Sequence, residues 1–322
     1  MYDINVIGNA PVDMLTHVPE SLISEHNLNK GDFNQVDSAT FDAITQQCTV
    51  EEMQSGGSCA NSAWALAKIG KNVHFTGHIG NDAAGQHFYT DMEAVGITMP
   101  APQQGSRTME IYVLITPDGE RTFVSQGVTA PITAEMIHEE TFQQSPWLFI
   151  EGYTLLDQEP AVLKAIDLAK QNQCKIAFTV SADFVIHIKQ QDIFSDILPH
   201  IDLFLANEEE YALLQEYIEK LPETEQQQAK EQLNNMAQVV THSEKGATFK
   251  NAEGEQFMPT TAVQTVDATG AGDAFAAGFL SKYLDYDVEN GLKTGHQIAG
   301  LVVQQVGARL KNWQSYNQQK IA

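Results

Sequence analysis

A seven-residue run near the C-terminus, Asp267-Ala-Thr-Gly-Ala-Gly-Asp273, constrains the fold of this chain more than any other feature. The β-branched residues that precede it, from Val263 to Val266, predict an extended strand. Phe275 and Phe279 follow it one helical turn apart. The run therefore predicts a strand, a tight glycine turn and a helix N-terminus, the connection from which α/β folds are assembled.

The predicted turn suits an anion. The amides of Gly270, Ala271 and Gly272 would lack helical acceptors at the positive end of the helix dipole. Asp273 would lie beside that anion, where a carboxylate can take the proton of an attacking hydroxyl during phosphoryl transfer. An isolated Gly-Ala-Gly-Asp suits equally a helix whose first acid only complements the dipole, whereas the complete run favours catalysis.

Composition narrows the class of protein. The 322 residues suffice for one large α/β domain, with or without a small appendage, or for two domains. The 42 acidic against 18 basic residues give a net charge of −24. That charge disfavours nucleic acid and anionic membrane surfaces and favours a protein that acts on small molecules. No leader and no membrane-spanning apolar run is recognisable, so we expect a cytoplasmic protein. Cys48, Cys59 and Cys174 have no metal-ligand spacing and predict reduced thiols.

Strands alternate with helices through the middle of the chain. Residues 147–150 and 175–180 read as buried strands, and Pro160 to Asn172 reads as the helix between them. This order predicts a mostly parallel sheet with helices on both faces. Tyr153 and Phe184 follow two of these strands, where aromatic residues are usually part of the core.

Two polar residues follow the first strand, which ends at Gly8. Asn9 and Asp13 would lie beyond the carboxyl end of that strand, the edge at which open α/β sheets bind ligands. Two short polar side chains can clamp a vicinal diol. A plain turn accounts for the same residues, because Asn, Pro and Asp all favour turns.

Ser55 to Gly70 reads as a glycine turn followed by an alanine-rich helix, with Ser58 as a possible N-cap and Gly70 as the stop. Gly57 would let the backbone approach a substrate, and Asn61 would lie in the first turn. Tight helix packing, which Gly and Ala also favour, explains the same pattern.

Two segments predict a small second sheet. The first has a strand at 33–36 and a helix at 39–47. The second, Met109 to Val124, reads as a hairpin around Pro117-Asp-Gly119.

Neither a P-loop nor a complete Rossmann glycine pattern is present, which leaves few other phosphate-binding folds.

Two signatures resemble those of the PfkB, or ribokinase-like, family of small-molecule kinases. The run at 267–273 matches the family pattern Asp-Thr-x-Gly-Ala-Gly-Asp, with Ala268 in place of the usual Thr, and Ser55 to Gly70 resembles the family's first signature. Within the family the chain is most similar to bacterial adenosine-kinase-like members. The resemblance implies an α/β fold: one three-layer α/β/α domain over 1–322, with a small β-sheet lid formed by approximately 12–45 and 104–127.

The resemblance also implies roles for particular residues. Those expected to bind the substrate are Asn9 and Asp13 on the ribose, Gly57, Ser58 and Asn61 on its hydroxyls, and Tyr153 and Phe184 around a purine. Those expected to bind the nucleotide are Asn207, Thr241, Ser243, Gly246, Gly270 and Gly272, although Ser243 stands where many members carry glycine. Glu210 and Asn207 would organise Mg²⁺ through water. The helix at 290–306 and the tail at 307–309 would cover the adenine of the nucleotide. Asp273 would be the catalytic base, assisted by the amides of Gly270, Ala271 and Gly272.

The expected activity is transfer of the γ-phosphoryl group of ATP to a primary hydroxyl, most naturally the 5′-hydroxyl of adenosine to give AMP. A sugar kinase acting on ribose, fructose or a keto-deoxy sugar acid is the first alternative, and a non-catalytic nucleoside or nucleotide sensor is the second. Some relatives require K⁺, and relatives occur as monomers and as homodimers. Both properties stay open here.

Overall fold

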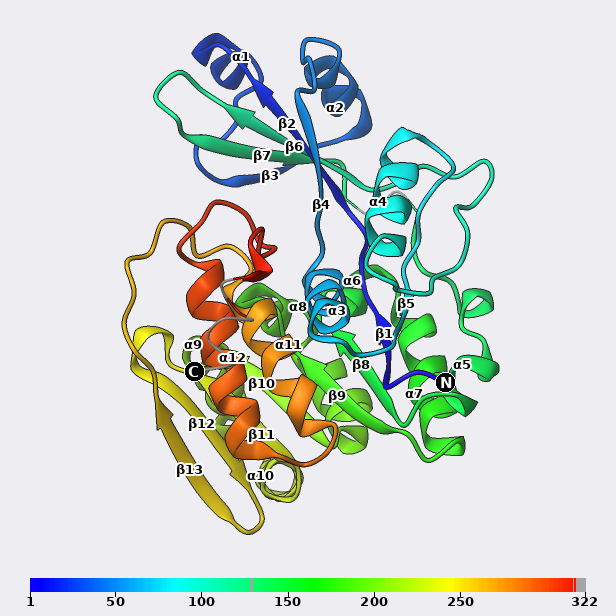
Figure 1. The fold of residues 1–322 in the computed structure, drawn as a ribbon, viewed down its shortest axis with the longest axis vertical. Coiled ribbons are helices and arrows are strands. Elements are labelled where there is room, and N and C mark those ends of the chain that lie inside the picture. The colour runs from blue at the N-terminus through cyan, green and yellow to red at the C-terminus, as the bar shows by residue number, and fades with distance from the viewer. Residues whose placement is uncertain (128–129, 315, 317–322) are drawn as a thin grey trace.

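The structure is a computed structural model that describes residues 1–127, 130–314 and 316, and over these residues the chain forms an eight-stranded and a five-stranded sheet (Figure 1). The larger sheet consists, from edge to edge, of β13 (Gly254–Pro259), β12 (Gly246–Asn251), β11 (Ala237–Thr241), β10 (Leu203–Asn207), β9 (Lys175–Thr179), β8 (Trp147–Glu151), β1 (Ile4–Ile7) and β5 (Val73–Thr76). The strands from β11 to β5 are parallel, and β12 and β13 are antiparallel additions.

Helices cover both faces of the larger sheet, and every residue of the inner strands β1 and β8 is buried. One face carries α3 (Ser58–Ile69), α4 (Ala83–Glu93), α11 (Ala271–Tyr283) and α12 (Val288–Val302). The other carries α5 (Glu139–Gln143), α6 (Thr154–Asp157), α7 (Glu159–Gln171), α8 (Asp183–Asp192), α9 (Glu208–Lys220) and α10 (Glu223–Asn235). Short turns complete the chain: η1 (Ala134–Met136), η2 (Ile193–Ile197), η3 (Leu198–His200) and η4 (Ser243–Lys245). The predicted three-layer α/β/α fold is confirmed.

The smaller sheet lies above the carboxyl edge of the larger one (Figure 1). Its strands are β3 (Phe33–Gln35), β7 (Arg121–Ser125), β6 (Glu110–Ile115), β2 (Val12–His17) and β4 (Glu52–Ser55). β4 lies outside both segments from which we predicted this sheet. The hairpin between β6 and β7 turns where expected, with the Gly119 amide donating to Thr116 O at 2.8 Å.

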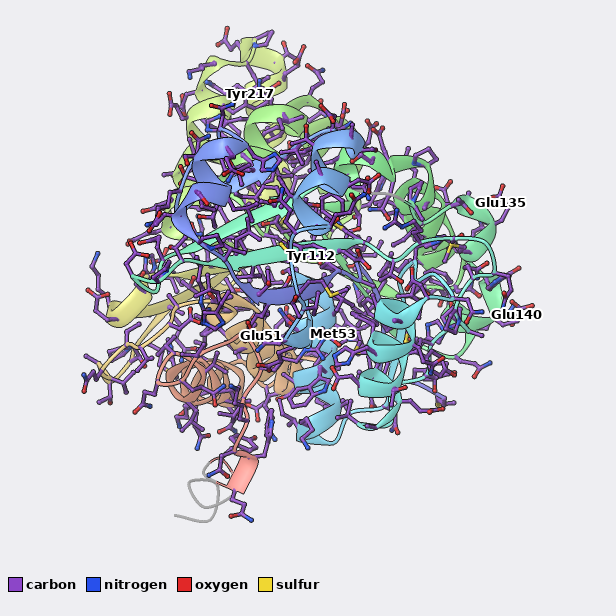
Figure 2. All side chains as sticks on the ribbon, turned by 90° about the horizontal axis from the view of Figure 1, so that it is seen from above. Glu51, Met53, Tyr112, Glu135, Glu140 and Tyr217 are labelled. Carbon is purple, nitrogen blue, oxygen red and sulfur yellow. The ribbon has the colours of Figure 1, made fainter. Side chains whose placement is uncertain are left out.

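Two helices cover the outer face of the smaller sheet, α1 (Glu20–Glu25) and α2 (Ser38–Thr45), as the view from above shows (Figure 2). Phe41 and Ile44 of α2 pack with Leu114 and Val124 of the sheet in a separate apolar cluster. Tyr112 of β6 meets Phe41 edge to face, with ring centroids 5.5 Å apart. The smaller sheet therefore has its own core on the outside and leaves its inner face toward the larger domain.

Two local predictions were wrong. Residues 263–266 form no strand; they have no neighbouring strand to pair with, and Val266 is 59% exposed. The helix after the first signature begins at Ser58, and Gly57 rather than Ser58 is its N-cap. Gly70 does end that helix, in the left-handed conformation with φ +104°.

The parallel register brings the carboxyl ends of the strands to one edge. Thr241 at the end of β11 is paired with Asn207 at the end of β10, and Glu151 ends β8 opposite Thr179 of β9. Among the described residues, no helix is both long and apolar enough to cross a lipid bilayer.

Candidate active site

A cavity of about 1510 Å³ opens between this strand edge and the inner face of the smaller sheet. The predicted site residues that line it are Asn9, Asp13, Gly57, Ser58, Asn61, Tyr153, Phe184, Asn207, Glu210, Thr241, Gly270, Ala271, Gly272 and Asp273. Ser243 and Gly246 are not among its lining residues. A Cβ on Gly246 would lie 2.1 Å from Met258 O, so the close approach of β13 explains that glycine.

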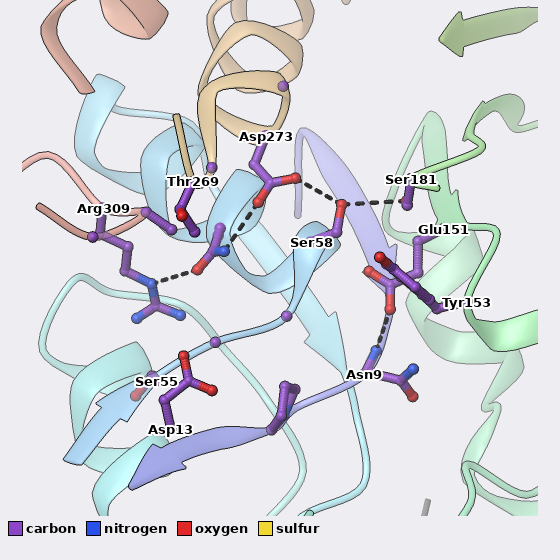
Figure 3. Close-up of a pocket in the computed structure, with 18 of the residues that line it drawn as sticks. Asn9, Asp13, Ser55, Ser58, Glu151, Tyr153, Ser181, Thr269, Asp273 and Arg309 are labelled. Carbon is purple, nitrogen blue, oxygen red and sulfur yellow. Dashed lines mark hydrogen bonds between the residues drawn. The ribbon is translucent and has the colours of Figure 1, made fainter. Parts of the chain in front are cut away.

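Asp273 lies in the first turn of α11, half-buried at the cavity wall (Figure 3). Ser58 Oγ donates to its Oδ1 at 2.7 Å, and Asn61 Nδ2 donates to its Oδ2 at 3.0 Å. Both donors belong to α3, so the two signatures of the sequence meet at this carboxylate. Ser58 and Asn61 thus orient Asp273, a contact we did not predict for them.

Burial raises the pKa of Asp273 to about 6. The two hydrogen bonds and the positive charge of Arg309 lower that pKa, but they compensate the loss of hydration only in part. A carboxylate with a pKa near 6 is ionised at neutral pH and is a stronger base than an exposed aspartate.

The N-terminus of α11 differs in one respect from our prediction. The Ala271 amide donates to Ala268 O at 3.1 Å, whereas the amides of Gly270 and Gly272 have no acceptor among the described residues. Gly270 has φ +75°, and a Cβ there would lie 2.5 Å from Ala308 Cβ. Two of the three amides predicted to be free are therefore free, and the Asp273 amide, which also has no acceptor among the described residues, joins them at the positive end of the helix.

Asn9 and Asp13 do not form the predicted clamp. Asn9 Oδ1 accepts a hydrogen bond from Gln158 Nε2 at 2.5 Å, and Figure 3 shows the Asn9 side chain directed away from Asp13. Burial raises the pKa of Asp13 to about 6, against a smaller opposing effect of Arg309. A Cβ on Gly57 would lie 2.2 Å from Asn9 O. The close approach of the Asn9 backbone therefore already requires glycine at this position, whether or not a substrate binds there.

Tyr153 and Phe184 contact each other instead of facing one another across a gap. Their ring centroids are 5.8 Å apart and the rings are tilted by 51°. Parallel rings on either side of a purine would be about 7 Å apart, because each aromatic contact needs roughly 3.5 Å. In this conformation the two rings form one wall of the cavity, and the predicted sandwich is not present.

Asn207 and Glu210 begin α9 in a capping box. Asn207 Oδ1 accepts from the amides of Glu209 and Glu210, and Glu210 Oε2 accepts from the Asn207 amide at 2.9 Å. Glu210 is buried, and burial raises its pKa. Its Oε1 has no partner among the described residues and is available to a metal-bound water. A carboxylate oxygen of this kind fits a hydrated Mg²⁺, which prefers oxygen ligands.

Sequence reasoning missed a buried acid, Glu151. It ends β8, is fully buried, and accepts from the amides of Asn9 at 2.8 Å and Cys59 at 2.6 Å. Burial raises its pKa to about 7, with a further contribution from Asp273. The sequence did contain a signal for this residue, because an acidic residue ends an apolar strand at the edge where open α/β sheets bind ligands.

Two arginines were also missed as site residues. Arg309 Nε donates to Asn61 Oδ1 at 3.0 Å, which places its side chain against the site. Arg121 of β7 lies 3.9 Å from Asp267, linking the smaller sheet to the run that precedes α11. Asp267 also accepts from the amides of Thr269 and Gly307 at 2.9 Å each, and so holds both loops.

Known proteins share this architecture. Residues 28–315 match the family described as pfkB family carbohydrate kinase. Adenosine kinase of Saccharomyces cerevisiae is 25% identical over 98% of this chain and 97% of its own, and ATP-dependent ribose-1-phosphate kinase of Halopiger xanaduensis is 28% identical over 80% and 83%. The crystal structure of adenosine kinase from Sinorhizobium meliloti is 27% identical, covers 100% and 99% of the two chains, and superposes with a TM-score of 0.82. The resemblance inferred from the two signatures is thereby confirmed, and the chain belongs to the PfkB family of carbohydrate kinases.

Proposed function

We propose that this protein is an ATP-dependent nucleoside kinase that phosphorylates the 5′-hydroxyl of adenosine to give AMP. The observation that carries the transfer chemistry is the convergence of one carboxylate, Asp273, with the free amides of Gly270 and Gly272 on one cavity. The family and the adenosine kinases similar to this chain support the same reaction.

In this proposal Asp273 accepts the proton of the hydroxyl as its oxygen bonds to the γ-phosphorus. The bond between that phosphorus and the oxygen shared with the β-phosphate breaks, and ADP leaves with the electron pair. The free amides at the start of α11 stabilise the charge on the moving phosphoryl group. Mg²⁺, when bound, would neutralise the ATP phosphates, and Glu210 with Asn207 would hold it through water.

The inner face of the smaller sheet favours a nucleoside over a free sugar. Leu15, Val113, Phe123 and Phe33 are register partners on adjacent strands and all line the cavity. This apolar row suits the face of a purine base, because flat apolar surface packs favourably against aliphatic and aromatic side chains. A bare sugar would leave the row without an apolar partner.

The smaller sheet would serve as the lid over this site. We assign to it approximately residues 12–45 and 104–127, extended by β4. Because Arg121 already approaches Asp267, closure would bring a cation toward the phosphates and exclude water from the transfer.

A sugar phosphate or sugar acid is the alternative acceptor. Lys68, Arg121 and Lys311 also line the cavity, and cations would recognise such an anionic acceptor. The similarity to a ribose-1-phosphate kinase supports the same possibility.

A panel of acceptors tests the proposal directly. Adenosine, other nucleosides, ribose, fructose, ribose 1-phosphate and a keto-deoxy sugar acid are offered with MgATP, and ADP release and the phosphorylated product are measured. Asp273→Asn, purified in parallel, is the control for contaminating kinases.

The highest kcat/KM with adenosine, and AMP as product, would support the nucleoside assignment. Turnover of sugars alone would replace it with a sugar kinase. Binding of adenosine without ADP release from any acceptor would indicate a sensor that does not catalyse.

A further inference from the structure

Arg309 is the least exposed cation at the site and is held on several sides. Its guanidinium makes an ion pair with Asp91 of α4, and its side chain is 13% exposed. It also lies over the ring of Trp64, 5.6 Å from the centroid. These contacts fix the guanidinium, so its direction is set before any ligand binds.

The fixed guanidinium determines how the Asn61 amide is turned. Arg309 Nε donates to Asn61 Oδ1 at 3.0 Å, and Asn61 Nδ2 donates to Asp273 Oδ2 at 3.0 Å (Figure 3). The opposite orientation would place the amide oxygen against the carboxylate and the amide NH₂ against the cation, and both contacts would be repulsive. Only the observed orientation satisfies all three groups.

We propose that Arg309 is a positioning residue for the base, acting through Asn61 to hold Asp273 in its reactive orientation. The proposal rests on the proposed function, because it assigns Asp273 the role of base. It gives Asn61 a task besides any contact with the substrate. It also connects a residue beyond α12 to the start of α11.

Charge supports this arrangement. The titratable groups around Asp273 are Glu151, Cys59, Tyr153 and Arg309, and Asp13 and Asp91 face Arg309. Among these groups Arg309 supplies the positive charge, which lowers the pKa of Asp273 and that of Asp13. Its removal should raise the pKa of Asp273, because a carboxylate near a cation is stabilised in its ionised form.

Arg309→Met is the test, and Lys71→Met is the matched control. Lys71 is also a largely buried cation in an ion pair, 3.3 Å from Asp285, but it does not line the cavity. With the acceptor that the wild type uses, Arg309→Met should lower kcat about ten-fold and change the acceptor KM little. The acid limb of its pH profile should move up by about one pH unit, and the control should change neither.

Two further variants separate position from charge. Arg309→Lys keeps the charge but loses the planar fork, so it should retain the wild-type acid limb while kcat falls. Asn61→Ala should lose about as much kcat as Arg309→Met, and the double variant should lose no more than either, because the residues act in one chain. Losses of kcat that add up in the double variant would overturn the proposal. A folded Arg309→Met enzyme with unchanged kcat and pH profile would overturn it too. An effect confined to the acceptor KM would also reject it, because Arg309 would then be a substrate contact.

A measurement without turnover keeps this inference separate from the proposed function. The raised pKa of Asp273 means that the folded state favours its protonated form, so wild type should lose stability relative to Asp273→Asn as pH rises toward about 6. In an Arg309→Met background that loss should extend to higher pH. If the wild type phosphorylates no acceptor, the proposed function fails, whereas an unshifted stability difference rejects the role of Arg309.

Discussion

Two helices begin at the same edge of the larger sheet with an acid in the first turn, and they use that acid differently. Glu210 of α9 accepts from the amide of Asn207, so the helix satisfies its own end. Asp273 of α11 makes no capping bond to its helix and accepts from Ser58 and Asn61 of α3 instead.

The difference shows how an acid at a helix start can be either structural or reactive. In α9 the Glu210 carboxylate belongs to the capping box of its own helix. Its removal should therefore lower the stability of that helix before it affects anything else. In α11 the amides of Gly270 and Gly272 stay free, and another element orients the carboxylate. The contrast predicts that substitutions at α11 change turnover, whereas substitutions at α9 change stability or metal binding.

The largest effect should come from Asp273→Asn. Loss of a general base lowers kcat by roughly 10²- to 10⁴-fold, while an amide can keep the contacts with Ser58 and Asn61 by turning. ADP release and thermal unfolding measure the two properties. A correctly folded variant with more than about a tenth of the wild-type rate, roughly 1.4 kcal/mol of barrier, would contradict the role of Asp273.

The pH dependence should follow the same carboxylate. Because the base must be ionised and its pKa is raised to about 6, kcat/KM should fall about ten-fold per pH unit below pH 6 and level off above it. The pKa of Asp13 is also raised to about 6, so Asp13→Asn is the control. Burial raises the pKa of Glu151, which also lines the cavity, to about 7, so Glu151→Gln is a second control. Retention of the acid limb in both variants assigns it to Asp273, and its disappearance in one of them would assign it to the residue replaced there.

The sequence predicted the parts of the site that are specified locally. The run at 267–273 contains its own turn and helix start. The alternation of strands and helices predicted the mostly parallel sheet with helices on both faces. The residues at 263–266 misled us because β-branched side chains favour strands only where a neighbouring strand is available.

Contacts between distant segments could not be predicted. Arg309 and Asn61 are 248 residues apart, and Glu151 meets Cys59 across 92 residues. Nothing local to Arg309 distinguishes it from a surface arginine. Asn9 and Asp13 were paired because both follow the carboxyl end of the first strand and match residues of the family, but Figure 3 shows their side chains directed apart.

At α9, Glu210→Gln should separate capping from metal binding. A glutamine oxygen can still accept from the Asn207 amide, so the unfolding temperature should stay near that of the wild type. Loss of the charge should raise the Mg²⁺ concentration needed for half-maximal activity by about ten-fold. A titration with Mg²⁺ at fixed ATP measures this, and an unchanged requirement would make Glu210 purely structural.

The smallest effect should come from Asn207→Ala, which removes the side chain that caps two amides of α9. Loss of such a cap costs about 1 kcal/mol of unfolding free energy, which denaturant titration can resolve. Asn207→Asp is the matched control, since a carboxylate accepts the same hydrogen bonds and complements the helix dipole. With saturating Mg²⁺ the alanine variant should keep most of the wild-type kcat, because we expect the start of α9 to stabilise the fold and not to take part in phosphoryl transfer. A loss of kcat comparable to that of Asp273→Asn, without loss of stability, would show that both helix starts are reactive and would remove the distinction between them.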